Sequence, residues 1–315
     1  MTGLSVLVPC LNEGIQVEVA YRELTGELAA IEGLEILFVD DGSTDDSLAR
    51  IRALAEADPR VSYLSFTRNF GIEAVMGAGF RYARRPWIVQ CDADLQVPPS
   101  QIWRLLDKAV EGYDVVFGRR VRRRDPLIRK IGSAGLHWAA RVVFRIEMPE
   151  GASTFRLIRT PVARTISELR LPWFMPAVSL VGARHTAVDV THRERDSGRS
   201  KLRLGRLAGH SFELFFGFSW RPLNALYLMA VLGMAAAVLG LEAAHLLVSA
   251  GTLGGMAVVG RYVRRLAPPP PLFYVRESNL PIRPEDSLTG GDPCPPPPGR
   301  GEPTAPSEGT GAIAR

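Results

Sequence analysis

Two aspartates one residue apart, Asp92 and Asp94, are the residues of this chain best suited to chemistry. They follow Trp87-Ile88-Val89, an apolar run of the kind that forms a buried strand. Two carboxylates so close repel one another unless a cation lies between them, and hard divalent cations prefer oxygen ligands. Gln96 supplies a third, neutral oxygen. The spacing therefore points to a site for a hard divalent cation.

The same aspartates have a plainer interpretation, because Asp is common in turns and at the residue that caps a helix. A helix is predicted to begin at Gln101, so a purely structural role stays open at this point. An EF-hand calcium loop fits worse. It needs a glycine at its sixth position, where this chain has Val97 followed by Pro98 and Pro99.

The elements that must position these residues alternate along the first 118 residues. Strands are predicted at 4–8, 35–39, 61–66, from Trp87 to the aspartates and at 114–118, and helices at 15–31, after Asp46, at 72–84 and at 101–111. Such alternation predicts an α/β fold with a mainly parallel, Rossmann-like sheet flanked by helices. The carboxyl ends of parallel strands meet at one edge, where ligands bind. That edge gathers Asn12, Glu13, Asp40, Asp41, Asp92 and Asp94.

Two local patterns refine this prediction. Ser43 and Asp46 have the spacing of a capping box at the start of a helix. The helix at 72–84 carries small residues that would let it pack closely on the sheet, namely Ala74, Gly77, Ala78 and Gly79. This is not a dinucleotide-binding fingerprint, because it lies within the helical stretch and Tyr82 replaces the third glycine.

Composition indicates a globular protein with anionic partners. The 315 residues are 46% hydrophobic and 23% charged, and the net charge of +5 comes mostly from arginine. This balance suits phosphates, acidic lipid headgroups or nucleic acid. The cysteines Cys10, Cys91 and Cys294 are too scattered for a zinc site or a disulfide framework. We therefore expect reduced thiols and a cytosolic fold without a secretory signal.

Two arginine-rich segments follow the predicted sheet. The first runs from Arg119 to Arg124 and precedes Lys130 and Ser133. The second, at 193–206, contains Gly198-Arg199-Ser200-Lys201, which resembles a phosphate-gripping loop but lacks the upstream glycine and strand of a P-loop. Either segment is alternatively a solvated surface. Nucleic-acid binding is disfavoured, because the arginines do not alternate with exposed aromatics and no nucleic-acid module is present.

The last third of the chain is apolar and then rich in proline. Residues 223–241 form a run of nineteen without a charge, long enough to span a bilayer, and 246–263 form a second apolar run. The flanking Arg221 and Arg261 favour a tight hairpin whose two ends face the cytoplasm. A buried pair of core helices is the alternative. From Glu277 to Arg315 the composition predicts a disordered tail.

Several short motifs occur in a fixed order from Leu4 to about Val275. They are Val8-Pro9 with Asn12-Glu13, Val39-Asp40-Asp41-Gly42-Ser43, Arg68-Asn69-Phe70-Gly71, Asp92-Ala93-Asp94-Leu95-Gln96 with Pro98-Pro99, Gly118 with Arg120, Phe155-Arg156-Leu157, Arg195 with Gly198 and Ser200, and Gly217-Phe218-Ser219. In this order the chain resembles the family-2 glycosyltransferases of GT-A fold that move a sugar onto a polyprenyl phosphate. That group includes dolichyl-phosphate mannose synthases and bacterial undecaprenyl-phosphate sugar transferases.

The resemblance implies roles for individual residues. Asp92, Asp94 and Gln96 would hold Mg²⁺ or Mn²⁺ on the diphosphate of a UDP- or GDP-hexose. The donor would be contacted by Pro9, Asn12, Glu13, Asp40, Asp41, Arg68 and Asp92. The lipid phosphate would lie among Arg120, Lys130, Ser133, Arg195 and Ser200, and the catalytic residues would be Asp92, Asp94, Arg120 and Arg195. One departure concerns Ala152-Ser153-Thr154, where relatives usually have an acidic residue before the Phe-Arg pair.

We therefore expect an inverting, metal-dependent hexosyltransferase at the cytoplasmic face of the inner membrane. A metal-bound diphosphate is a good leaving group, and a phosphate monoester, with a second pKa of about 6, attacks without a base.

The expected domains are 1–160 for nucleotide-sugar binding and catalysis, 161–220 for the acceptor loop and juxtamembrane segment, 221–265 for a transmembrane hairpin and 266–315 for the tail. A polysaccharide or protein acceptor, or a non-catalytic membrane-anchored relative, is the alternative. The sugar, the base and homo-oligomerisation stay open.

Overall fold

The structure is a computed structural model that describes residues 3–120, 142, 152–169, 174–193, 221–238, 240, 248, 251–252, 254–256, 258–260 and 273–287. Four residues predicted to bind the acceptor lie outside these ranges, namely Lys130, Ser133, Arg195 and Ser200. For Arg120 the structure gives the position in a strand only.

The described strands form one mixed sheet. They are β1 (Leu4–Cys10), β2 (Leu34–Asp40), β3 (Val61–Phe66), β4 (Trp87–Gln90), β5 (Val115–Arg120), β6 (Ala152–Arg159), β7 (His185–Val190) and β8 (Val275–Ser278), in the spatial order β7-β5-β6-β4-β1-β2-β3-β8. Neighbours pair in parallel except where β6 lies between β4 and β5 and where β8 borders β3. The predicted mainly parallel α/β sheet is therefore confirmed, with each of the five predicted strands present.

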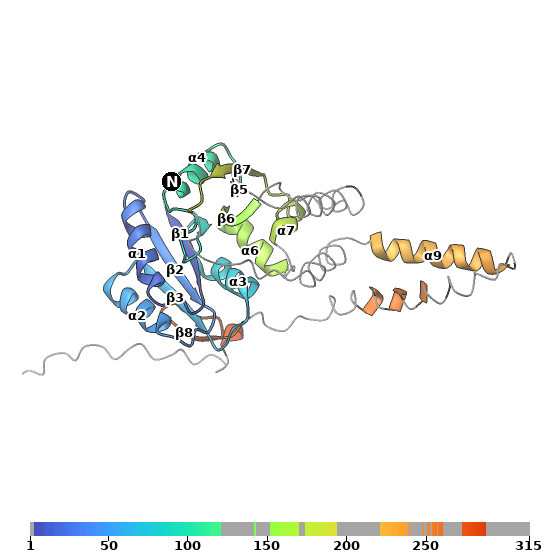
Figure 1. Cartoon of the computed structure of the whole chain (residues 1–315), viewed down its shortest axis with the longest axis horizontal. Helices are drawn as coiled ribbons and strands as arrows, with labels where there is room; N and C mark the ends of the chain where they lie inside the picture. The colour runs from blue at the N-terminus through green and yellow to red at the C-terminus, as the bar shows by residue number, and fades with distance from the viewer. Residues whose placement is uncertain are drawn as a thin grey trace, which may run out of the picture.

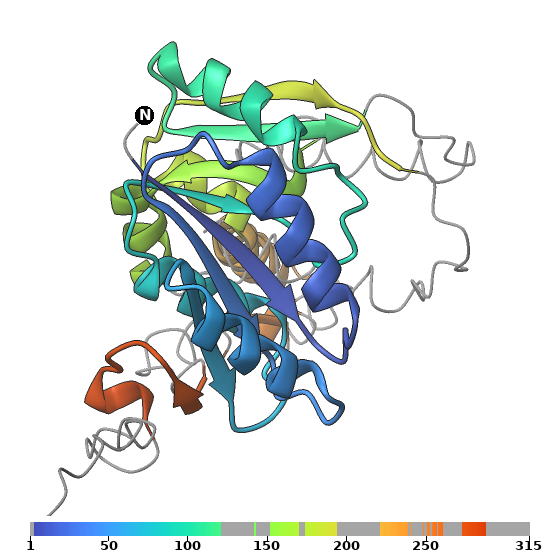
Figure 2. The same cartoon turned by 90° about the vertical axis from the view of Figure 1, so that its left-hand side faces the viewer.

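Helices cover both faces of this sheet (Figure 1). On one face, α1 (Gln16–Glu27), α2 (Ser47–Ala57) and α4 (Gln101–Val110) share a core with the side chains of Val6, Phe38 and Val89. Figure 2 views the sheet from this side. On the other face, α3 (Ile72–Tyr82), α6 (Thr160–Leu169) and α7 (Phe174–Leu180) pack with Leu7 and Leu37. Alternating side chains of each strand supply the two cores, as period-two patterning requires.

The close packing predicted for the helix at 72–84 is confirmed. Ala74, Ala78 and Gly79 of α3 are buried against the sheet, and a methyl group at Gly79 would overlap the side chain of Leu7. Only a residue without a Cβ allows the backbone of α3 to lie this close to the Leu7 side chain. This contact fixes α3 over β1.

The apolar helix α9 (Arg221–Val238) extends away from the sheet (Figure 1). Its large side chains are exposed, with 57% of Leu232 and 88% of Val238 accessible. Within the described ranges, no helix combines the length and the apolar character that a membrane span needs. The second predicted run, 246–263, is described only in part.

The predicted disorder from Glu277 onward is wrong for residues 277–287. Val275–Ser278 forms β8, which pairs antiparallel with β3, and Pro284–Asp286 forms a 3-10 helix, η2. Asp286 is buried and pairs with Arg81 at 2.6 Å. The residues that hold this short segment in place are more than two hundred positions away in the sequence. The local composition therefore did not show that the segment is ordered. Residues 288–315 of the predicted tail lie outside the described ranges.

Candidate active site at the carboxyl edge of the sheet

Asp92 and Asp94 project from the same side of the segment that follows β4. Both are exposed, whereas Cys91, Ala93 and Leu95 between and around them are buried. Leu95 adopts a φ of 48°, and its N–H donates to the Asp92 carbonyl at 3.0 Å, so the segment forms a tight turn. The apolar side chains fasten this turn to the core and leave both carboxylates facing outward.

The surroundings of Asp92 disfavour its negative charge. Although Asp92 lies at the surface, the protein atoms around its carboxyl group displace part of the hydrating water, which raises its pKa. The negative charge of Asp94 raises this pKa further. Hydrogen bonds oppose this shift: Thr154 Oγ1 donates to Asp92 Oδ2 at 3.3 Å, and Gln90 donates as well. A cation between the two acids would relieve the repulsion that the protein leaves in place.

Gln96 lies beside Asp94 but acts there as a hydrogen-bond donor. Its side-chain Nε2 donates to Asp94 Oδ2 at 2.5 Å, and its backbone N–H donates to Asp94 Oδ1 at 3.3 Å. The role of Gln96 as a metal ligand therefore stays a prediction, which requires its side-chain oxygen. Across the described part of the chain, no group of three or more His, Cys, Asp or Glu side chains could hold a metal ion.

The residues present nevertheless fit one kind of cation site. Mg²⁺ is usually held by one or two carboxylates while waters and substrate phosphates complete its shell. Asp92 and Asp94 supply such a pair of carboxylates on an open surface. The pKa of Asp92 is raised, and binding of a cation would lower it. This donor set suits a metal that arrives with a phosphate ligand better than an enclosed protein cage.

Arg156 is a buried cation behind the acids, and the sequence pointed to it only as part of the Phe155-Arg156-Leu157 motif, without a role. It is 5% exposed, it pairs in register with Gln90 on β4, and its Cζ lies 3.6 Å from the ring centre of Phe174. Desolvation lowers its pKa to about 10, while Glu73 and Asp92 favour its charge. Its buried Nε has no hydrogen-bond partner. The available signal was an arginine inside the apolar strand Phe155-Arg156-Leu157.

The loops after β1 and β2 are tied together beside this site. Asp40 is fully buried, and its carboxylate accepts from the Ser43 N–H at 3.0 Å and from Ser65 Oγ at 2.7 Å. Ser43 Oγ accepts from the Asn12 N–H at 2.9 Å, and Asn12 Oδ1 accepts from the Thr44 N–H at 2.9 Å. Asp40 therefore supports the loops from behind, while Asn12 is exposed at their surface.

The predicted capping box is wrong. Ser43 bonds to the neighbouring loop, and the Ser47 N–H at the start of α2 donates instead to Asp45 Oδ1 at 3.0 Å. Helix α2 begins four residues after Ser43, so the hydroxyl of Ser43 is free to join two loops instead. Ser43 and Asp46 have the spacing of a capping box, but this spacing alone does not determine the residue at which the helix begins.

The loop after β3 is held by Asp41. Its two carboxylate oxygens accept from the N–H groups of Phe70 and Gly71 at 2.7 and 2.9 Å, and burial raises its pKa. Gly42 has a φ of 76°, and a methyl group there would overlap the backbone of Arg68. Hydrogen bonds thus join the loops after β1, β2 and β3 into one continuous surface.

The remaining predicted residues lie around this surface. Pro9 is half-buried in β1, the Glu13 N–H donates to Ser47 Oγ at 2.9 Å, and exposed Arg68 places its Cζ 4.3 Å from the ring centre of Phe70. On the other side of the acids, the Arg193 N–H donates to the Gln96 carbonyl at 2.8 Å. The second arginine-rich segment therefore begins beside the candidate metal ligands.

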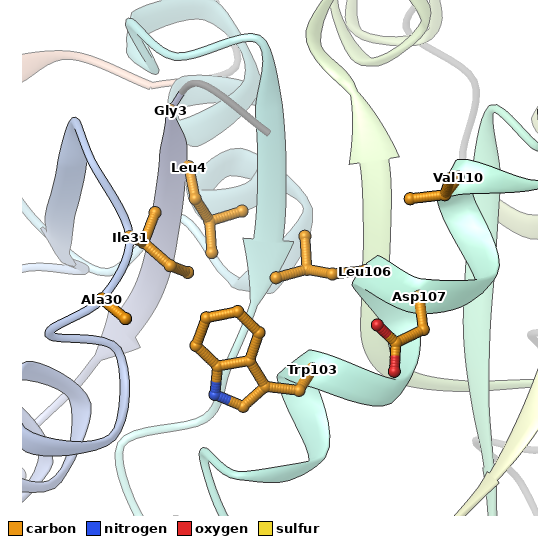
Figure 3. Close-up of a pocket in the computed structure, with 8 residues that line it drawn as sticks. All are labelled: Gly3, Leu4, Ala30, Ile31, Trp103, Leu106, Asp107 and Val110. Atoms are coloured by element: carbon orange, nitrogen blue, oxygen red, sulfur yellow. The ribbon is translucent and has the colours of Figure 1, made fainter.

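A cavity of about 210 Å³ lies elsewhere, at the opposite edge of the sheet (Figure 3). Trp103, Leu106 and Val110 of α4 line it together with Leu4 at the start of β1 and Ile31. It is mainly apolar and holds none of the predicted site residues. The candidate site is therefore the open surface at the carboxyl edge.

Comparison with known proteins agrees with this arrangement. Residues 5–165 match the model of glycosyl transferase family 2. The chain is 32% identical over 301 residues to the uncharacterized glycosyltransferase YkcC of Bacillus subtilis, covering 87% of this chain and 93% of that one. It is 34% identical over 252 residues to an undecaprenyl-phosphate 4-deoxy-4-formamido-L-arabinose transferase of Salmonella paratyphi A, covering 78% of this chain and 75% of that one.

Among solved structures, mannosyl-3-phosphoglycerate synthase from Rubrobacter xylanophilus is 14% identical with a TM-score of 0.49, covering 68% of this chain and 71% of that one. The family match spans the sheet from β1 to β6 and includes the loops and acids described above. This protein therefore belongs to glycosyl transferase family 2 and is a glycosyltransferase.

Proposed function

We propose that this enzyme moves a hexose from UDP- or GDP-hexose onto a polyprenyl phosphate, such as undecaprenyl or dolichyl phosphate, at the cytoplasmic face of the inner membrane. The observation that carries the proposal is the exposed Asp92 and Asp94 pair beside three tied loops at the carboxyl edge of the sheet. The similarity to an undecaprenyl-phosphate sugar transferase supports the choice of acceptor.

The nucleotide would bind on the three loops. Exposed Asn12 and Arg68 and half-buried Pro9 and Glu13 offer groups to the base and ribose, on a surface that Asp41 holds in shape. Asp40, which is fully buried with both oxygens bonded, would act through the loops and not by direct contact. A surface fixed by so many internal bonds binds with little loss of conformational entropy.

The diphosphate would be held through a divalent cation. Asp92 and Asp94 would bind Mg²⁺ or Mn²⁺, with Gln96 contributing after its amide turns its oxygen toward the ion. When bound, such a cation neutralises charge that develops on the departing nucleotide diphosphate. The acids themselves position the diphosphate against the loops, and the buried Arg156 behind them adds positive potential.

The acceptor phosphate needs positioning and little else. Its second pKa of about 6 makes it largely a dianion near neutrality, so attack on the anomeric carbon would need no general base. Direct displacement would invert that carbon. Arg120, Lys130, Ser133, Arg195 and Ser200 would hold the phosphate. The Arg193–Gln96 hydrogen bond supports this assignment, because it brings the chain to the acids two residues before Arg195.

Contact with lipid would come from α9 and the apolar run after it. An exposed helix this rich in apolar side chains is unfavourable in water and suits a lipid environment. The sequence has Arg221 before this apolar run, and a basic residue there suits anionic lipid headgroups. We propose that residues 221–265 form a hairpin that enters the bilayer or lies in its interface.

A transfer assay tests the proposal. Purified protein in detergent with undecaprenyl phosphate, Mg²⁺ and each labelled UDP- or GDP-hexose should form a glycolipid from at least one donor. Asp94→Ala should remove nearly all turnover. Arg120→Ala should cripple transfer to the lipid phosphate. An Arg120→Ala enzyme with undiminished activity toward a hydroxyl acceptor would instead favour a polysaccharide or protein acceptor.

A further inference from the structure

The C-terminal residues that return to the sheet touch the loops of the candidate donor site. We propose that residues 273–287, termed the return segment, position those loops for the nucleotide sugar, and that Arg276 is a positioning residue for donor binding. The inference rests on the proposed function, because it concerns the same loops. It assigns a role in donor binding to a part of the chain more than one hundred residues beyond the family match.

The first contact is with the loop after β3. The Thr67 N–H donates to the Tyr274 carbonyl at 3.0 Å, one residue before Arg68. The rings of Phe70 and Tyr274 meet edge to face at 6.3 Å, and Phe273 stacks on Phe66 at 5.0 Å. The return segment therefore contacts this loop from the β8 side of β3, at the edge of the sheet. Asp41, which follows β2, contacts the loop from the other side.

The second contact reaches the loops after β1 and β2 through a chain of hydrogen bonds. Arg276 Nη2 donates to Ser65 Oγ at 3.2 Å, and Ser65 Oγ donates to Asp40 Oδ2 at 2.7 Å. Asp40 in turn accepts from the Ser43 N–H, and Ser43 Oγ accepts from the Asn12 N–H. Arg276 thus places a positive charge two hydrogen bonds from the buried carboxylate that shapes these loops.

Separate interactions anchor the return segment. Glu277 pairs with Arg52 and accepts from Tyr63 Oη at 2.7 Å. Asp286 accepts from Tyr82 Oη at 2.6 Å and pairs with Arg81. These bonds tie it to α2, β3 and α3. Such anchoring holds Arg276 and Tyr274 against the loops with little freedom, as a positioning role requires.

The arrangement predicts an effect on donor affinity and not on the chemical step. Arg276 is exposed and lies on β8, which β3, β2 and β1 separate from β4, the strand that the acids follow. Its removal should loosen the loops that meet the nucleotide while leaving Asp92 and Asp94 unchanged. The loss should therefore appear in KM for the donor, with kcat preserved.

Calorimetric titration of the full-length protein with UDP and with GDP in Mg²⁺, together with steady-state kinetics, tests the inference. Arg276→Met and Ser65→Ala should each weaken nucleotide binding about two- to tenfold, the loss expected for one hydrogen bond. The double variant should lose less than the product of the two effects, and Arg276→Lys should recover part of the affinity. Arg283→Met is the matched control, because Arg283 is exposed on the same segment and faces Glu285.

The possible failures are distinct. Wild-type affinity and KM in Arg276→Met would overturn the inference, as would an equal loss in Arg283→Met. A fall in kcat at unchanged KM would also overturn it. A wild-type protein that binds neither nucleotide would overturn the proposed function and the inference with it.

Discussion

Asp92 of the candidate site is held in an environment that disfavours its negative charge. Asp92 is flanked by Asp94, and protein around it removes water, so both effects raise its pKa. Thr154 and Gln90 compensate in part. Sites that bind cations commonly carry such unfavourable charge in the free protein, which trades stability for function.

This repulsion predicts that Asp92→Asn stabilises the metal-free protein at neutral pH. A carboxyl whose pKa is raised on folding stabilises the fold below its unfolded pKa, and that stabilisation is lost as pH rises through the folded pKa. At pH 7 the neutral amide should therefore raise Tm in the presence of a chelator, and near pH 3 the difference should vanish. Added Mg²⁺ should raise Tm for the wild type and much less for the variant. A lower Tm for Asp92→Asn in chelator at pH 7 would contradict this account.

Gly42 gives a second prediction at the scale of one residue. Its φ of 76° and the nearby backbone of Arg68 leave no room for a side chain. Gly42→Ala should lower the free energy of unfolding by more than about 1 kcal/mol and weaken nucleotide binding. Gly26, inside α1 with open space around it, is the matched control. There Ala should stabilise by about 0.5–1 kcal/mol, measured for both by urea denaturation.

At the scale of elements, the regular part of the fold was predictable and the irregular part was not. Strands β1 to β5 and helices α1, α3 and α4 follow local apolar patterns, and their predicted bounds differ from the observed ones by at most four residues. Strand β6 was missed because Arg156 interrupts its apolar run and because it runs antiparallel between two parallel strands. Strand β8 is four residues long and depends on distant partners.

The candidate site shows the same division. Asp92, Asp94, Asn12 and Asp41 were predicted to share one edge, and parallel strands bring them there. The sequence could not show that Asp40 is fully buried, that Gln96 donates to Asp94, or that Arg156 lies behind the acids. Each depends on which face of its strand or turn the tertiary fold covers.

The anchoring of the return segment predicts a large effect of one buried carboxylate. The side chains of Arg81 and Asp286 are 13% and 5% exposed, and Tyr82 also donates to Asp286. Asp286→Ala should cost about 3–5 kcal/mol, because it leaves the Arg81 charge buried without its partner. Glu285→Gln, at the exposed neighbouring position, should be nearly neutral in the same denaturation experiment. Equal stability of the two variants would mean that residues 284–286 do not dock in solution.

At the scale of the whole molecule, a folded catalytic sheet carries an apolar helix that its own core does not cover. Tyr227, Leu228 and Leu232 of α9 are each more than half exposed. The chain leaves the sheet after β7 and returns at β8, so α9 is linked to the domain on both sides. A net charge of +5 adds attraction to acidic lipids.

Flotation with vesicles containing anionic lipid tests this arrangement. The wild-type protein should float with the vesicles, and the double substitution Leu228→Glu and Leu232→Glu should reduce the bound fraction severalfold. Val110→Glu, at a residue of α4 that is 75% exposed, is the matched control and should float like the wild type. Unchanged flotation of the α9 variant would assign lipid contact to another part of the chain.

The central claim is that Asp92 and Asp94 bind the nucleotide diphosphate through a divalent cation. Calorimetric titration of UDP and of GDP, with Mg²⁺ or Mn²⁺ and again with chelator, tests it most directly. The wild type should bind one nucleotide only when the metal is present, and Asp94→Asn should lose that dependence together with at least about tenfold in affinity. Equal nucleotide binding with and without metal, or full metal-dependent binding by Asp94→Asn, would contradict the claim.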